Sequence, residues 1–307
     1  MKKCLVIGAT MLNLTLFIDW LPSPGDNIYG QSQTMALGGC AYNVADILKH
    51  FKIPYDLFAP VGTGVYADII TRKLTDAGHK SLIKSSRQDN GYFLCLAEPD
   101  GEKTFVTLPG IECNYEPEWF DLLNPSEYDC VYVSGEEIER DGGEHIIRFL
   151  ENNPDLTVYY APGPRLSFIS CEKQKRMEAL HPILHITEEQ ALCYSRRNSY
   201  EKAAEALYKK YQNTVMITLG SKGVYLKDRK TLLIKSSPVN TVNMAGVEDA
   251  HVGAVIALTK LGLEPEQALA EANHISSIVM QIEGSTLNAD AFTEQTVCSN
   301  LYQAASY

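Results

Sequence analysis

The sequence lacks several features that would mark whole classes of protein. None of its 8 cysteines forms a Cys-x-x-Cys pair or stands at zinc-ligand spacing from a histidine, which argues against zinc-finger and dithiol redox proteins. No apolar run approaches ~18 residues, so we expect no transmembrane helix. The start of the chain has no long apolar segment with a small-residue cleavage site, so we expect a first strand and turn there rather than a signal peptide. Together with reduced thiols, this predicts a cytoplasmic protein.

Basic charge is also scarce. The chain has 27 Lys and Arg residues against 38 Asp and Glu residues, for a net charge of −11 over 307 residues. A nucleic-acid binder normally carries a basic surface, so neither nucleic acid nor a membrane is expected as a partner. The Gly-x-x-x-x-Gly-Lys-Ser/Thr pattern of P-loop proteins is missing. Flexible linkers and internal repeats are missing too, which disfavours a chain of independently folded domains joined by linkers.

What the sequence does contain is an alternation of short apolar runs and amphipathic stretches. Strands alternating with helices predict an α/β fold, a mostly parallel sheet with helices on both faces. The expected strands are Cys4–Ile7, Cys130–Ser134, Thr157–Ala161, Ile183–Ile186, Thr214–Thr218 and Val224–Leu226. The expected helices are Ala41–Phe51, Tyr66–Ala77, Glu144–Glu151, Tyr200–Tyr211, Asp249–Leu261 and Pro265–Ile282.

Two β-rich insertions interrupt this alternation, at Leu12–Leu37 and Gln88–Cys113. The second contains the turn Glu98–Gly101, whose Asp-Gly pair is a strong hairpin signal between β-rich runs. The two insertions could pair into one small sheet that covers a site as a lid. The alternative is that each forms a separate surface hairpin.

The first candidate site is the pair Gly38-Gly39 just before a predicted helix. Paired glycines let a ligand approach the backbone and leave helix N-terminal amides accessible. Asn43, in the first turn of that helix, could bind a hydroxyl group. The alternative is a turn followed by an ordinary helix.

The second candidate site opens the apolar helix that follows Gly246. The amides after this glycine could form an anion pocket reinforced by the helix dipole. Asp249 could act there as a general base on a substrate hydroxyl. The alternative is a carboxylate that only complements the dipole.

The third candidate is Thr218 with Gly220 and Gly223. A strand ends there, and the backbone could pack on a nucleotide; a tight β-turn is an equal alternative.

The histidines give weaker signals. His251 could be an exposed or helix-capping residue as readily as a catalytic one. His181 and His185 have the i, i+4 spacing of a helical metal pair, but their segment is predicted to be a strand, which disfavours a metal site.

Taken in chain order, these clusters resemble the ribokinase-like sugar kinases of the PfkB carbohydrate kinase family. The resemblance runs the whole chain and includes Val6–Gly8, Leu21–Gly25, Val61–Gly62 and Ala272–Asn273. The segment 242–283 is weakly similar to the pseudouridine kinases of the family. The resemblance implies a three-layer ribokinase-like domain over residues 1–307, with a β lid (12–37 and 88–113) through which such kinases often form homodimers.

The resemblance also implies an activity. The γ-phosphate of ATP would pass to a hydroxyl of a small sugar or nucleoside, with magnesium and, as an option, a monovalent cation. Asp249 would be the base, and the amides around Gly246 would stabilise the transferring group. The acceptor would be bound by Asn13, Gly38, Gly39 and Asn43. The nucleotide would be bound by Thr218, Gly220, Gly223, Val247, Glu248 and Asn273.

The sequence departs from the family pattern at three places. The family's Asp-Thr-Thr-Gly-Ala-Gly-Asp reads Asn-Met-Ala-Gly-Val-Glu-Asp here, so Glu248 replaces a glycine. The Glu248 carboxylate would stand where the phosphate should approach. Two like charges about 4 Å apart repel by about 4 kcal/mol at an effective dielectric near 20, which would hinder catalysis. The family's Asn-x-x-Glu aligns with Thr187 and Gln190, and its first sugar-binding Asp with Asn13. Two interpretations follow: a working kinase, or a ligand-binding homologue with little phosphoryl transfer that serves as a sensor or partner protein.

Overall fold

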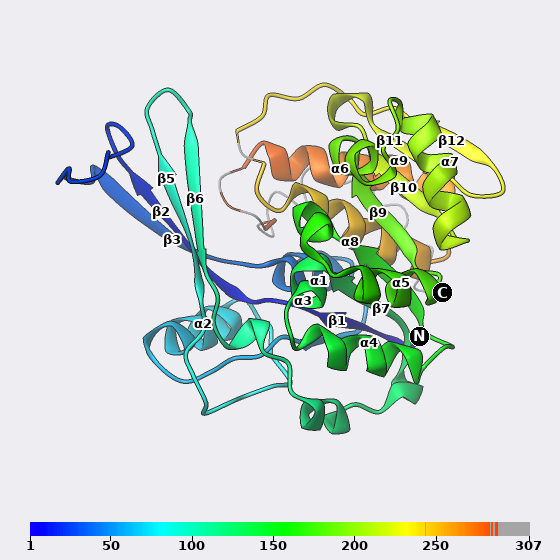
Figure 1. Cartoon of the computed structure of the whole chain (residues 1–307), viewed down its shortest axis with the longest axis horizontal. Coiled ribbons are helices and arrows are strands. Elements are labelled where there is room, and N and C mark those ends of the chain that lie inside the picture. The colour runs from blue at the N-terminus through cyan, green and yellow to red at the C-terminus, as the bar shows by residue number, and fades with distance from the viewer. Residues whose placement is uncertain (243, 283, 285, 288–307) are drawn as a thin grey trace.

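A central sheet of eight strands organises the computed structural model (Figure 1). The structure describes residues 1–242, 244–282, 284, 286 and 287. The six neighbouring strands from β4 to β10 run parallel, and β11 and β12 continue the sheet antiparallel. In sheet order the strands are β12 (Thr231–Ile234), β11 (Val224–Lys227), β10 (Val215–Thr218), β9 (Ile183–Thr187), β8 (Thr157–Ala161), β7 (Tyr128–Ser134), β1 (Lys3–Ile7) and β4 (Tyr55–Phe58).

Helices cover both faces of this sheet, because its inner strands are apolar on both sides. Along β1, Cys4 and Val6 pack into one core and Leu5 and Ile7 into the other, as the alternation of a strand requires. The first core is covered by α1 (Cys40–His50), α2 (Val65–Asp76), α8 (Val247–Lys260) and α9 (Pro265–Met280). The second is covered by α3 (Gly135–Glu139), α4 (Gly143–Glu151), α5 (Cys171–Ala179), α6 (Glu188–Ser195) and α7 (Tyr200–Tyr211).

Short 3-10 helices complete the connections. They are η1 (Ile111–Cys113), η2 (Pro117–Leu122), η3 (Pro125–Glu127), η4 (Gly163–Phe168) and η5 (Gly220–Lys222). Within the part of the chain that the structure describes, no helix is both long and apolar enough to cross a membrane.

The two β-rich insertions pair into one small, separate sheet, which projects from the main body (Figure 1). Its strand order is β3 (Ser32–Gly38), β2 (Met11–Phe17), β5 (Tyr92–Ala97) and β6 (Lys103–Leu108). Gly101 has a positive φ of 94° at the predicted hairpin turn between β5 and β6, a backbone conformation that favours glycine. The prediction of a mostly parallel sheet with helices on both faces and a second, smaller sheet is therefore confirmed.

The periodicity analysis missed the short elements. Strands β4 and β12 have four residues each, and helix α5 has few apolar residues and a single buried side chain, Met177. Strand β12 alternates only between exposed and half-buried residues, and α5 is mostly polar, so neither shows a clear apolar pattern. Predicted and observed bounds coincide for β8 and α7 and differ by one or two residues at the ends of the other predicted elements.

Candidate active site

Two helices begin with glycines in left-handed conformations and meet at their N-termini. Helix α1 is preceded by Gly39 with φ 102°, and α8 by Gly246 with φ 75°. The side chain of Asn43 on α1 donates from its Nδ2 to Oδ2 of Asp249 on α8, at 2.8 Å. The structure thus joins the first and second candidate sites, which lie 206 residues apart in sequence.

Asp249 is half-buried and is held by donors from three elements. Besides Asn43, the buried Tyr132 hydroxyl on β7 donates to Oδ1 at 3.4 Å, and the thiol of Cys40 on α1 also donates to the carboxylate. Burial raises the pKa of Asp249 above its usual value, and the three donors oppose that rise because they bind the charged form. A carboxylate with a raised pKa is a stronger proton acceptor than a surface aspartate.

The remaining predicted acceptor residues lie at the base of the small sheet. Asn13 on β2 lies against Gly38 on β3, where a Cβ would approach its Nδ2 to 2.3 Å. At Gly39 a Cβ would lie 2.4 Å from the carbonyl oxygen of Ala9. Gly39, which has a positive φ and meets backbone, is therefore required by its close contact, whereas Gly38 leaves room for the Asn13 side chain beside the start of α1.

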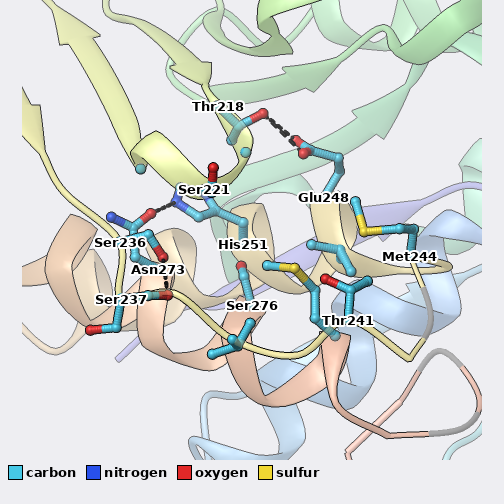
Figure 2. Close-up of a pocket in the computed structure, with 15 residues that line it drawn as sticks. Thr218, Ser221, Ser236, Ser237, Thr241, Met244, Glu248, His251, Asn273 and Ser276 are labelled. Atoms are coloured by element: carbon cyan, nitrogen blue, oxygen red, sulfur yellow. Dashed lines mark hydrogen bonds between the residues drawn. The ribbon is translucent and has the colours of Figure 1, made fainter.

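A separate cavity gathers the predicted nucleotide residues (Figure 2). It lies between η5, the chain after β12, and helices α8 and α9. All six residues predicted for the nucleotide line it: Thr218, Gly220, Gly223, Val247, Glu248 and Asn273. A Cβ on Gly220 would meet nothing within 4 Å, so the backbone there is open to a ligand.

Glu248 turns toward the sheet rather than toward Asp249. Thr218 at the end of β10 donates from its hydroxyl to the Glu248 carboxylate, with both oxygens at 2.9 Å (Figure 2). The Glu248 side chain keeps 44% of its surface exposed. Its surroundings raise the pKa of Glu248 to about 7, mainly through burial, with the Asp249 charge adding to the rise and Thr218 opposing it.

The interpretation of His251 as an exposed or capping residue was wrong. His251 is 2% exposed, because every residue of α8 from 250 to 258 is buried. Its Nδ1 lies 2.8 Å from Nε2 of the equally buried His185 on β9, and its Nε2 lies 3.2 Å from Oδ1 of Asn273 on α9. His185 therefore pairs with His251, and no i, i+4 partnership with His181 forms.

With this geometry in view, the comparisons with known proteins decide the family. The family model for pfkB family carbohydrate kinases matches residues 1–291. The chain belongs to the pfkB family of carbohydrate kinases. It is 29% identical over 288 residues to the uncharacterized sugar kinase YegV of Escherichia coli, covering 92% of this chain and 90% of that protein. It is 23% identical over 258 residues to the ribokinase of Lactococcus lactis, covering 83% and 82%.

Solved structures share the ribokinase-like fold over nearly the whole length. The ribokinase of Thermotoga maritima superposes with a TM-score of 0.82 at 18% identity, covering 95% of this chain and 98% of that one. The Arabidopsis thaliana ribokinase, complexed with ribose and ATP, gives 0.79 at 17% identity over 96% and 98%. An Escherichia coli structure in complex with ATP and Mg²⁺ gives 0.75 at 16% identity over 95% and 98%.

The altered Asn-x-x-Glu segment of this pfkB family member serves as a helix cap. Thr187 accepts a hydrogen bond from the Gln190 amide at 3.3 Å, and the Gln190 side chain accepts from the Thr187 amide at 3.2 Å. This reciprocal capping box starts α6. The neighbouring Glu188 pairs with Lys222 of η5 at 3.4 Å. The two substituted positions therefore hydrogen-bond to each other. The first residue of the anion-hole pattern, Asn243, lies outside the described residues.

Sequence analysis missed two carboxylates near Asp249. Glu136 and Glu137 follow β7 directly, at the carboxyl end of a parallel strand, where ligands of such sheets bind. Burial, then the Asp249 charge, raises the pKa of Glu136, while Arg165 lowers it. Burial raises the pKa of Glu137 to about 8, and it accepts from the hydroxyl of Ser134. The sequence signal that could have revealed these residues is a pair of adjacent glutamates directly after a predicted strand.

Metal ligands do not form a preassembled cluster. Among the residues that the structure describes, no three His, Cys, Asp or Glu side chains come together as a metal site. Magnesium is usually held by one or two carboxylates together with substrate phosphates rather than by a complete protein cage. The partly exposed carboxylate of Glu248, which lines the cavity, fits that mode of binding.

Proposed function

We propose that this protein is an ATP-dependent kinase that transfers the γ-phosphate to a hydroxyl of a small sugar, with a nucleoside as the alternative acceptor, and that Asp249 is the general base. One observation carries the proposal: the hydrogen bond between Asn43 and Asp249 joins the predicted acceptor residues to the N-terminus of α8. The ribokinases and the sugar kinase among its relatives support a sugar as acceptor.

The acceptor hydroxyl has to meet Asp249 on the side left open by its three donors. Asn43 holds Oδ2 of the carboxylate, which fixes its orientation. Asn13 and the backbone of Gly38 and Gly39 lie at the base of the small sheet, where they would bind the other hydroxyls. The raised pKa of Asp249 suits it to take the hydroxyl proton as the oxygen attacks phosphorus.

The phosphoryl group would be stabilised at the start of α8. A helix N-terminus presents backbone amides and the positive end of the dipole to an anion. No described side chain caps this helix, which begins after Gly246. These amides would bind the group in transfer, and preorganised donors of this kind lower the barrier without reorganisation.

The nucleotide would occupy the cavity beside η5, with its phosphates toward α8. The ATP-bound structures with this fold support the choice of nucleotide. When bound, magnesium supplies charge neutralisation between the phosphates. In this chain Glu248, which lines the cavity wall, would hold it. A monovalent cation is tested by repeating the assay with and without potassium.

We further propose that the small sheet covers the acceptor as a lid and forms a homodimer. The residues Met35, Leu14, Leu94 and Val106 are aligned across its four strands. This row lies on the face opposite Asn13, because neighbouring residues of a strand point to opposite sides. Met35 is 40% exposed and Val106 52%, so an apolar row remains for a second copy to cover.

A binding protein with little phosphoryl transfer is the second candidate. The capping box favours it, since Thr187 and Gln190 hydrogen-bond to each other where the family has Asn and Glu. In that case a sugar would raise the melting temperature of the protein, while no phosphorylated product would form.

A coupled ADP-release assay over pentoses, hexoses and nucleosides tests both candidates. For the kinase, Asp249→Asn should lower kcat by about 10²–10⁴-fold, because the amide keeps the shape but accepts no proton. Asp129→Asn is the matched control, since Asp129 pairs with Lys260 at the other end of α8. Equal turnover of Asp249→Asn and Asp129→Asn would refute the role of Asp249 as base.

A further inference from the structure

Two buried polar side chains lie at the junction of the small sheet with the main body. Asn90 precedes β5 and is 3% exposed, and Glu112 lies on η1 after β6 and is 0% exposed. Asn90 donates from Nδ2 to Oε2 of Glu112 at 3.2 Å. Because buried polar groups need hydrogen-bond partners, the other partners of this pair show which segments it holds together.

Glu112 ties together the two ends of the hairpin formed by β5 and β6. Its Oε1 accepts from the amide of Gly110 at 2.7 Å, and its Oε2 accepts from the amide of Gly91 at 3.0 Å. The two backbones cross closely there, since a Cβ on Gly91 would lie 2.0 Å from the carbonyl oxygen of Leu108. With the bond from Asn90, the carboxylate accepts from three N–H groups. A carboxamide would place its own NH2 group against one of them.

Asn90 ties this hairpin to the rest of the molecule. Its Nδ2 also donates to the carbonyl oxygens of Pro60 at 3.0 Å and of Thr10 at 3.4 Å. Its Oδ1 accepts from the amide of Gly62 at 2.8 Å. Pro60 and Gly62 follow β4 at the edge of the main sheet, and Thr10 stands directly before β2. The Asn90 side chain therefore joins the main sheet, the first strand of the small sheet and the hairpin.

The strand that carries Asn13 lies between two attachments to the main body. In the small sheet, β2 is the neighbour of both β3 and β5 (Figure 1). On one side, β3 leads through Gly39 into α1. On the other side, Asn13 is in register with Phe93, which follows Asn90 at the start of the hairpin. The position of Asn13 relative to the start of α1 therefore depends on both attachments.

We propose, on the basis of the kinase function above, that Asn90 and Glu112 are positioning residues for the acceptor, which hold the small sheet so that Asn13 reaches a sugar bound at the start of α1. The Asn13 carboxamide can both donate to and accept from a hydroxyl group. Neither Asn90 nor Glu112 is among the described residues that line the nucleotide cavity. A change at Glu112 therefore weakens the binding of the acceptor and leaves the binding of ATP as it is.

Steady-state kinetics of Glu112→Gln, on protein shown to be folded by circular dichroism, separates this role from a merely structural one. The KM for the sugar acceptor should rise by about tenfold, which is the effect of losing about one hydrogen bond from Asn13. The KM for ATP should remain unchanged. Glu98→Gln is the matched control at the far turn of the same hairpin, where the glutamine oxygen can still accept from the Leu21 amide. It should leave both KM values unchanged.

A double-mutant cycle tests whether Glu112 acts through Asn13. Asn13→Ala removes the side chain that Glu112 positions, so adding Glu112→Gln should raise the acceptor KM by less than about twofold further. A further rise of about tenfold would overturn the proposal, because distant and independent sites add their effects. An unchanged acceptor KM in Glu112→Gln would overturn it as well. Equal rises in the KM for acceptor and ATP would also overturn it, since they indicate a general loss of structure.

The positioning role and the kinase function fail in different ways. If the parent protein forms no phosphorylated product, the kinase function is refuted, and the rise in melting temperature on sugar binding replaces KM as the readout. That rise should be smaller in Glu112→Gln than in Glu98→Gln, and equal rises would overturn the positioning role. If no sugar or nucleoside raises the melting temperature of the parent protein, the acceptor site is refuted and the positioning role with it.

Discussion

Removing the carboxamide of Asn43 should raise the pKa of Asp249 and shift the acid limb of the pH–rate profile upward. In Asn43→Ala, the donor 2.8 Å from Oδ2 is lost, while Cys40 and Tyr132 remain. A hydrogen bond to the charged form of a carboxyl group lowers its pKa, so its loss raises the pKa. The base must be ionised to act, and activity will therefore fall at a higher pH than in the parent protein.

The size of the shift follows from the energy of the lost bond. A hydrogen bond to a charged group contributes about 1.5–3 kcal/mol, and one pKa unit corresponds to about 1.4 kcal/mol. Asp249 is half-buried, so water replaces part of the lost bond. We therefore expect the apparent pKa in kcat/KM to rise by about one unit.

The assay is the pH dependence of kcat/KM for the sugar acceptor at saturating ATP. Asn198→Ala, which removes an exposed amide near the start of α7, is the matched control and should leave the profile in place. A lower rate for Asn43→Ala with an unmoved acid limb would contradict the argument, and would show that Asn43 contacts the acceptor without affecting the base.

Three further predictions concern Glu248, the small sheet and its attachment. Glu248→Gly should lower kcat by about tenfold or more, since it removes a ligand of the nucleotide site; a rise in turnover would show that Glu248 obstructs the phosphate. Val106→Lys should convert a dimer to a monomer in light scattering, whereas Phe105→Lys, on the other face of the sheet, should remain dimeric; dimers in both would contradict the proposed interface. Glu112→Gln should lower the free energy of unfolding in urea by about 1–3 kcal/mol, because its buried carboxylate accepts from the Gly91 and Gly110 amides; an unchanged midpoint would refute this.

How far the sequence predicts this fold depends on how clear the apolar pattern of each element is. Helix α7 (Tyr200–Tyr211) and strand β8 (Thr157–Ala161) are predicted to the residue, because the apolar positions of α7 repeat with a helical period and β8 is a short continuous apolar run that ends before Pro162. The four residues of β12 alternate between exposed and half-buried at the sheet edge, which is too weak a pattern. The Asp-Gly turn predicts the hairpin, but the pairing of β2 with β5 depends on tertiary structure.

Some residues of the candidate site could likewise be found from the sequence, and others could not. Gly39 and Gly246 both have a positive φ and stand directly before helices. A glycine before a predicted helix can be recognised from the sequence alone. The partnership of His185 and His251 could not be found, since 66 residues separate them and only the order of the sheet brings β9 beside α8. A lone histidine in an apolar helix gives no indication of its partner.

The geometry of α8 explains how the family's glycine can become a glutamate without placing a charge against the base. Successive residues of a helix point about 100° apart, so Glu248 and Asp249 leave the same turn in different directions. Asp249 reaches α1 and the acceptor side, where Asn43 holds it. Glu248 reaches β10 and the nucleotide side, where Thr218 holds it. If the proposed function is correct, the substitution would alter how the nucleotide is bound and leave the proposed base in place, which is why we favour a working kinase over an inert homologue.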